Sequence, residues 1–211
     1  MDRKINLFPL QLFEFHSSKR MSETLALEIL KEPSQKNDLN KILGNGRAHK
    51  RTTSNIKKNA WEFFNAEMFE WFNQCLDAVK NEMFIPEISL QITECWGTRT
   101  DRFEKMHPHT HPNSLMSGIW YLTDHPKSTT NFYYDNPNNI TSEILNIYKP
   151  EKKILKESIT PEVGKLIIFP SSLRHDVSPN TTSIPRLTIA FNTFASGDFG
   201  VPSSTLRMRI E

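Results

Sequence analysis

The sequence lacks several features that would place it in a specialised class of proteins. No run approaches the roughly 20 apolar residues of a membrane-spanning helix, and residues 1–4 do not open the apolar stretch of a signal peptide. Only two cysteines, Cys75 and Cys95, occur in 211 residues, which favours a reduced, cytoplasmic setting. The formal net charge of +2 is too small to argue for nucleic acid or an acidic membrane as a partner.

The N-terminal part of the chain carries the helical patterns. Apolar residues recur at helical spacing within Ser22–Lys31, and Pro33 follows, so we expect a short helix there. Large apolar side chains repeat every three or four residues over Trp61–Val79. This pattern predicts a helix packed on a sheet, a more common use of such an aromatic stripe than a stacking platform. Residues 36–59 are polar and contain a Gly-Asn-Gly turn signal, so we expect a loop.

After Pro86 the apolar period changes from that of a helix to that of a strand. Ile88, Leu90 and Ile92 alternate with polar residues, as in a half-buried strand. The further strand-like runs are Leu115–Thr123, Asn131–Tyr134, Ile154–Ile159, Lys165–Phe169 and Arg186–Phe194. No helical pattern alternates with these runs, which argues against a parallel α/β fold. We predict a mainly β fold with N-terminal helices, a double-stranded β-helix (jelly roll) buttressed by helices.

The length of the chain limits how it can be divided. A chain of 211 residues can bury one substantial core and is marginal for two domains. We therefore expect a single domain over 1–211. Within it, residues 1–84 would form a helical support, 85–195 the jelly-roll core and 196–211 a C-terminal tail.

Three of the seven histidines lie within five residues, at His107, His109 and His111. Alternate residues of an extended strand point to one face, and neighbouring prolines favour extension, so His109 and His111 could aim at one point. His175 could add a third metal ligand from a strand that the jelly roll brings alongside. These histidines could instead be solvated loop residues, with His175 a satisfied core histidine, so the histidines alone leave metal binding open.

The predicted strand from Arg186 to Phe194 carries a second candidate site. Arg186 and Thr188 share one face, and Leu187, Ile189 and Phe191 share the other. An arginine inside the barrel would require an anionic partner, because an unpaired buried charge is costly. A guanidinium with a hydroxyl two residues away suits the carboxylate of a ligand. The alternative, in which Arg186 faces solvent and the apolar residues form the core face, fits the alternation equally well.

Together these elements resemble the iron(II)- and 2-oxoglutarate-dependent oxygenases. That superfamily carries His-x-Asp/Glu, a distal His and then Arg-x-Ser/Thr, matched here by His109-Thr110-His111, His175 and Arg186-Leu187-Thr188. The chain more closely resembles short oxygenases of marine bacteria and phages that have a His-x-His-Pro…Ser-Gly-x-x-Tyr motif. The segments that carry this closer resemblance are His109–Leu122, Gly164–His175 and Arg186–Asn192, together with Trp96. The resemblance covers about residues 85–195.

The resemblance implies a role for each matching residue. His109 and His175 would be imidazole ligands of iron(II), while His111 stands where the superfamily usually has its carboxylate ligand. Arg186 would pair with the distal carboxylate of 2-oxoglutarate, and Thr188 would add a hydrogen bond.

Tyr121 lies in the strand segment where prolyl-hydroxylase-like members place a tyrosine on that same carboxylate. A core aromatic whose hydroxyl is satisfied elsewhere is the alternative interpretation of Tyr121.

The third metal ligand is where this chain departs from the superfamily. We expect His111 to bind the metal directly, so that three neutral imidazoles leave the iron its full formal charge and favour an anionic co-substrate. The alternatives are water or a carboxylate, from Asp124, Asp135 or Glu104. His107 shares a face with His109, and we expect it to support the site or to face the substrate.

The activity implied is that of a hydroxylase-type dioxygenase. It would couple decarboxylation of 2-oxoglutarate to oxidation of a protein side chain or small metabolite, with dioxygen as co-substrate and ascorbate as reductant. The polar segment Asn136–Lys153 is a candidate lid over the site. The competing functions are a cupin-like three-histidine metalloenzyme without 2-oxoglutarate and a non-catalytic jelly-roll binding module.

Overall fold

The computed structural model describes residues 10–36, 53–135, 154–201 and 203–210. The helical elements are α1 (Lys19–Lys31), the 3₁₀ helix η1 (Ala60–Phe63) and α3 (Ala66–Met83). The N-terminal strands are β1 (Phe13–His16), β2 (Ser34–Lys36) and β3 (Ser54–Asn59). The strands that follow α3 are β4 (Ile88–Thr100), β5 (Met106–His109), β6 (Met116–Tyr121), β7 (Thr130–Asp135), β8 (Ile154–Ile159), β9 (Lys165–Pro170), β10 (Arg174–Val177), β11 (Arg186–Val201) and β12 (Ser204–Met208).

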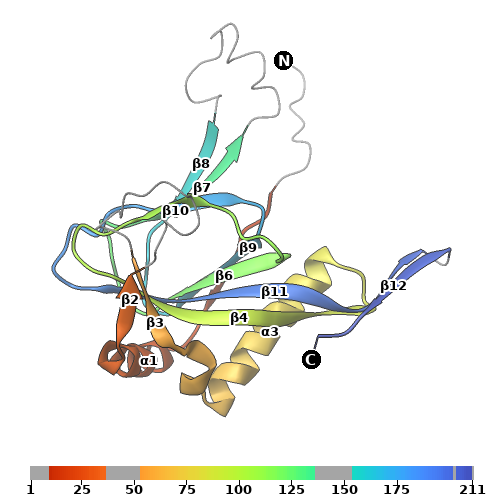
Figure 1. The fold of residues 1–211 in the computed structure, drawn as a ribbon, viewed down its shortest axis with the longest axis horizontal. Helices are drawn as coiled ribbons and strands as arrows, with labels where there is room; N and C mark the ends of the chain where they lie inside the picture. The colour runs from red at the N-terminus through yellow and green to blue at the C-terminus, as the bar shows by residue number, and fades with distance from the viewer. Residues whose placement is uncertain (1–9, 37–52, 136–153, 202, 211) are drawn as a thin grey trace, which may run out of the picture.

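The strands form two sheets, and all paired strands within each sheet are antiparallel. The larger sheet has the order β1-β9-β6-β11-β4-β3-β2, with β12 paired to β11. The smaller sheet has the order β5-β10-β7-β8 and lies over one face of the larger sheet (Figure 1). Strands far apart in the chain thereby become neighbours, as the predicted double-stranded β-helix requires.

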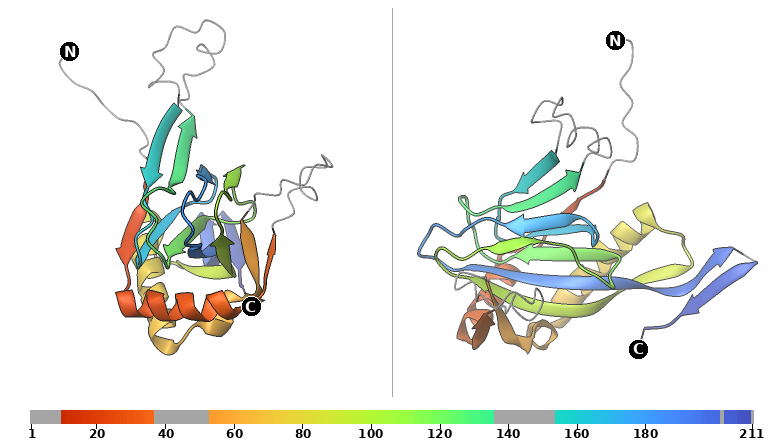
Figure 2. Two further views of the ribbon diagram at one scale, coloured as in Figure 1. Left: turned by 90° about the vertical axis from the view of Figure 1, so that its left-hand side faces the viewer. Right: turned by 45° about the horizontal axis from the view of Figure 1, so that its top comes forward.

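The helices cover the other face of the larger sheet, which Figure 2 shows from the side. Leu25 and Ile29 of α1 and Phe72 of α3 are each 1% exposed, and they pack in one core with Trp120 of β6 and Phe191 of β11. This helix-facing core contains most of the buried apolar side chains of the described residues. Burial of this kind is the dominant favourable contribution to folding.

A smaller apolar cluster lies between the two sheets. Ile119 of β6 and Phe169 of β9 contact Phe132 of β7 there, with Leu173 at its edge. The central strands β6 and β9 are therefore buried on both faces, which accounts for their nearly continuous apolar sequences.

Two boundaries in the N-terminal part differ from the sequence expectation. The long helix begins after Asn65, whose side chain caps Met68 N–H, whereas Trp61 belongs to η1. A capping asparagine stops the helix from extending backward because its side chain already satisfies one of the free N–H groups of the first turn. Residues 54–59, expected in a loop, form β3 because Ile56 is buried in the helix-facing core and the strand pairs with β4.

The C-terminal end also has more strand structure than expected. The strand predicted to end at Phe194 continues to Val201 as β11, and it pairs with β12 within the segment expected as a tail. The extension depends on backbone pairing with β4 and β12, which side-chain alternation does not report. The candidate lid, Asn136–Lys153, lies outside the described residues.

Two further observations concern the environment of the protein. Cys75 and Cys95 are free and buried in the helix-facing core, and burial raises the pKa of each thiol to about 12. Neither thiol is therefore a reactive nucleophile at neutral pH. Among the described helices, none has the length and apolar character needed to cross a membrane.

Candidate metal centre and co-substrate site

The smaller sheet brings two of the predicted metal ligands together. His109 ends β5 and His175 lies in β10, and the two residues are direct partners in the antiparallel pairing of these strands. Their ring centroids are 4.3 Å apart. One strand pairing thus places side by side two imidazoles that are 66 positions apart in the sequence.

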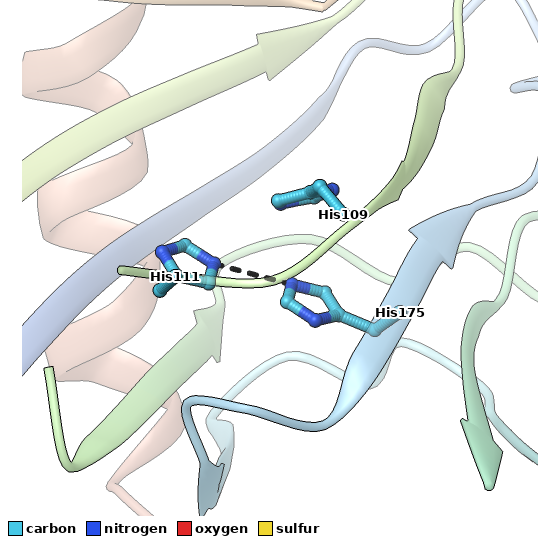
Figure 3. Close-up of side chains that lie close together, drawn as sticks. All are labelled: His109, His111 and His175. Carbon is cyan, nitrogen blue, oxygen red and sulfur yellow. Dashed lines mark hydrogen bonds between the residues drawn. The ribbon is translucent and has the colours of Figure 1, made fainter. Parts of the chain in front are cut away.

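His111 lies two residues beyond the end of β5. Its backbone N–H donates to the carbonyl of Ser171, with an N···O distance of 3.0 Å, and this bond holds the segment against the end of β9. The imidazole then turns toward the other two rings (Figure 3), so that its Nε2 is 3.3 Å from Nε2 of His175. Ligand atoms of all three histidines lie within 4.8 Å of one another, close enough to share one metal ion.

Backbone hydrogen bonds orient two of the rings. Nδ1 of His109 lies 2.7 Å from the carbonyl of His107, and Nδ1 of His175 lies 3.0 Å from the carbonyl of Leu173. A carbonyl accepts only, so each Nδ1 carries the proton and each Nε2 keeps a lone pair. Metal-bound histidines are typically held in this way by a partner on the ring nitrogen that does not bind the metal.

His111 is influenced by a side chain instead. Asn192 of β11 acts on the His111 imidazole and partly opposes the lowering of its pKa. The Asn192 amide is fixed in turn, since its Oδ1 accepts from Ser117 Oγ at 2.9 Å and its Nδ2 donates to Glu94 Oε2 at 3.1 Å. A carboxylate is therefore connected to His111 through one amide, although it does not touch the metal position.

Burial keeps the three imidazoles neutral. Desolvation, together with the nearby His109, lowers the pKa of His175 to about 3 and that of His111 to about 4. The pKa of His109 is also lowered by burial, although Asp176 and the His107 carbonyl partly oppose the shift. At neutral pH all three rings therefore present lone pairs, the form in which imidazole binds metals.

Carboxylates are absent from this cluster in the part of the chain that the structure describes. Asp124 instead accepts from the Val163 N–H at 2.7 Å, and the buried Glu104 accepts from the Asp101 N–H at 2.9 Å. Asp135 ends β7, and its side chain lies outside the described residues. Asp176, next to His175, accepts from Asn131 and Tyr133.

Arg186 lies inside the barrel. Its side chain is 2% exposed and lines a cavity of about 650 Å³ that the three histidines also line. Nη2 donates to Thr130 Oγ1 at 2.7 Å, whereas Nε and Nη1 are buried without a hydrogen-bond partner among the described residues. The alternative in which Arg186 faces solvent is therefore wrong, and two of its nitrogen atoms require an acceptor.

Tyr121 and Thr130 hold this guanidinium in place. The Tyr121 hydroxyl donates to Thr130 Oγ1 at 2.8 Å, and Arg186 Cζ lies 5.3 Å from the centre of the Tyr121 ring. Thr130 was not identified from the sequence, because a threonine at the start of a strand carries no distinguishing pattern. Thr188, 6% exposed, lines the cavity beside Arg186 as its strand position predicts.

Comparison with known proteins indicates which family of enzymes the site resembles. Residues 94–192 match the model of a protein family described as "Putative 2OG-Fe(II) oxygenase". Residues 94–192 therefore belong to the 2OG-Fe(II) oxygenases. Iron(II) and 2-oxoglutarate are the cofactor and co-substrate of this family. None of the curated proteins compared with the chain matches it significantly.

Several solved structures of enzymes share the fold of this chain. A prolyl-4-hydroxylase from Pseudomonas putida aligns with 87% of this chain and 92% of its own, at 13% identity and a TM-score of 0.59. The epimerase SnoN from nogalamycin biosynthesis aligns over 89% and 81%, at 11% identity and a TM-score of 0.61. HygX from Streptomyces hygroscopicus, solved with nickel and 2-oxoglutarate, aligns over 87% and 82%, at 11% identity and a TM-score of 0.57.

The side chains of the oxygenase domain fit both groups. Three convergent imidazole nitrogens suit iron(II), which accepts nitrogen donors and leaves other positions open for co-substrates. The buried Arg186 guanidinium, with two nitrogens that lack a partner among the described residues, suits an anionic group such as a carboxylate. His107 supports the site through its carbonyl, and its side chain lines the cavity.

Proposed function

We propose that this oxygenase is a hydroxylase whose iron(II) is bound by His109, His111 and His175. The proposal rests on the three imidazoles, which share a cavity with a buried, partly unsatisfied guanidinium. The backbone bonds at Nδ1 leave Nε2 of His109 and of His175 with a lone pair for a metal, and desolvation lowers the pKa of all three rings, so the rings are neutral at neutral pH. His111 thus takes the place of the usual carboxylate ligand.

Arg186 and Thr188 bind the distal carboxylate of 2-oxoglutarate in this proposal. Nη1 has no partner, and Nη2 carries a second N–H besides the one that donates to Thr130, so this edge of the guanidinium can bind the carboxylate through two parallel hydrogen bonds. Tyr121 supports this geometry indirectly, because its hydroxyl donates a hydrogen bond to Thr130 Oγ1. A direct hydrogen bond from Tyr121 to the co-substrate stays a prediction.

Bound iron(II) supplies the oxidising chemistry, in which 2-oxoglutarate loses carbon dioxide to become succinate as the two oxygen atoms of dioxygen pass to succinate and to the substrate. The protein binds and orients both co-substrates. The reduced, cytoplasmic setting inferred from the cysteines stays a prediction, supported by two free, buried thiols.

Turnover of 2-oxoglutarate tests the proposal. Purified protein with iron(II), ascorbate and 2-oxoglutarate should form succinate slowly even without substrate, and His175→Ala should abolish this formation. His16→Ala is the matched control, because His16 is an exposed histidine of β1 outside the cavity. Succinate formation that His175→Ala leaves at the wild-type rate would remove His175 from the metal site.

A binding measurement separates the proposal from its rivals. Under anaerobic conditions, 2-oxoglutarate should produce a weak visible charge-transfer band with the iron-loaded protein. A three-histidine enzyme that does not use 2-oxoglutarate would bind iron without this band. A non-catalytic module would retain no metal.

A further inference from the structure

The cavity extends beyond the positions proposed for iron and 2-oxoglutarate. In the pairing between β11 and β4, Thr188 lies opposite Thr98, and in the pairing between β4 and β3, Thr98 lies opposite Asn55. Two strand spacings separate Asn55 from Thr188, which is about 10 Å across the sheet. Thr98, Asn55 and the neighbouring Thr53 all line the cavity, so a chamber lies to the side of the co-substrate position.

Trp96 lines the same cavity close to the metal centre. Its ring lies 6.0 Å from the ring of His111, measured between centroids, with an interplanar angle of 30°. A group resting on Trp96 would therefore lie next to the metal position. The indole offers a flat apolar surface on which a planar or ring-shaped group can pack.

Asn55 carries a side-chain oxygen that has no hydrogen-bond partner within the described part of the protein. Its Oδ1 is buried and accepts no hydrogen bond from any described group. A buried acceptor without a donor is costly, and such atoms in native structures call for an explanation. Asn55 and Trp96 also line a second, more open hollow of about 510 Å³.

The charges of the chamber restrict its occupant further. None of the described residues that line the cavity is an aspartate or glutamate, so a cationic group would find no counter-ion there. The guanidinium in the cavity, Arg186, is assigned to 2-oxoglutarate. A neutral group therefore suits the remaining space better than an ion of either sign.

We infer that the chamber formed by Thr53, Asn55, Trp96 and Thr98 is the substrate subsite, and that it takes a neutral, flat apolar group bearing an N–H or O–H that donates to Asn55 Oδ1. The inference rests on the proposed function, because it places the reacting carbon between Trp96 and the metal. It names the chemical class of the substrate and makes Asn55 the residue that determines specificity.

Small aromatic probes that differ only in their polar group test this subsite. Benzamide carries N–H donors, methyl benzoate is neutral and carries none, and benzamidine is a cation. Binding is measured by ligand-observed NMR titration of the protein loaded with zinc(II), a diamagnetic replacement for iron, and saturated with 2-oxoglutarate. Benzamide should bind about tenfold more tightly than methyl benzoate, as one hydrogen bond to a buried acceptor allows.

Two variants of Asn55 test whether this residue causes the preference for benzamide over methyl benzoate. Asn55→Leu should make benzamide and methyl benzoate bind equally. Asn55→Asp keeps the side-chain shape and adds a charge, so it should strengthen benzamidine binding about tenfold. Asn81→Leu removes an exposed amide of α3 and should change neither result. If Asn55→Leu fails to fold, the test depends on Asn55→Asp alone, and benzamidine binding no stronger than to the wild type would then overturn the subsite.

The outcomes separate this inference from the proposed function. Equal binding of benzamide and methyl benzoate to the wild type, no binding of either, or a preference that survives Asn55→Leu would overturn the subsite. Binding of 2-oxoglutarate is measured on the same zinc-loaded samples by calorimetry. Its absence would count against the proposed function, whereas 2-oxoglutarate binding without a donor preference would remove only the subsite.

Discussion

Both faces of β11 are largely buried, but they differ in whether their polar atoms have hydrogen-bond partners. On the helix-facing side, Leu187, Ile189 and Phe191 are at most 1% exposed and are surrounded by apolar side chains. On the cavity side, Arg186 and Thr188 are 2% and 6% exposed, and Arg186 keeps two nitrogens without partners. Burial alone therefore does not distinguish core from site, whereas unsatisfied polar atoms do.

This comparison predicts that substitutions on the two faces have separable effects. Changes on the helix-facing side should lower stability and leave the affinities for metal and 2-oxoglutarate intact. Changes on the cavity side should weaken the binding of metal or 2-oxoglutarate and leave stability intact or raise it. A site that binds ligands is not optimised for the stability of the protein without them.

The largest effect should come from Phe191→Ala. Phe191 is fully buried, and its ring centroid lies 5.3 Å from that of Phe72 on α3. Loss of the ring should lower the free energy of unfolding by about 3–5 kcal/mol. Urea denaturation measures this change, and Leu206→Ala, at an exposed position of β12, is the control. A loss below about 1 kcal/mol would show that this face is not the main source of stability.

Arg186→Leu should show the opposite pattern. Removal of the guanidinium should weaken 2-oxoglutarate binding by about 2–5 kcal/mol, which is at least 30-fold, because a buried carboxylate would lose its partner. Stability of the protein without ligand should stay the same or increase, since an incompletely paired buried charge is lost. The measurements are calorimetric titration with 2-oxoglutarate and urea denaturation.

The exposed Arg207→Leu is the control for Arg186→Leu. An unchanged affinity for 2-oxoglutarate in Arg186→Leu would mean that the carboxylate is bound elsewhere in the cavity.

Asn192→Leu should weaken metal binding about 10- to 100-fold, the usual consequence of losing a group that orients a metal-bound histidine. His111 would lose the neighbouring amide that acts on its imidazole. Competition with a metal chelator measures the affinity.

Asn192→Asp combined with Glu94→Gln exchanges acceptor and donor and should retain most of the affinity. If the double variant binds metal no better than Asn192→Leu, the Asn192 amide acts by packing alone.

Glu94→Gln alone should have the smallest effect. Glu94 is exposed and reaches the site only through Asn192, so its charge is screened by solvent. We expect metal affinity to fall less than threefold, measured by the same chelator competition. A tenfold loss would indicate that the Glu94 carboxylate contributes to the metal centre as strongly as Asn192.

Sequence patterns predicted six of the twelve strands in the described residues, the central parts of α1 and α3, and the candidate ligands. The period of two after Pro86 and the histidine spacing depend on local geometry, in which alternate residues of a strand share a face. Helix and strand ends were less accurate, as β3 and the start of α3 show, because capping and pairing with distant strands decide them. Thr130 and Asn55 could not be identified, since neither belongs to a distinctive local pattern.

The sequence by itself determined which residues alternate along Arg186–Phe191, and it offered two equally consistent orientations of that strand. Only the tertiary structure decided between them, because both faces of β11 are covered, one by helices and the other by the smaller sheet. The same packing of two sheets brings His175 beside His109. A side chain acquires a role in this protein through what lies opposite it, and local sequence does not encode that neighbour.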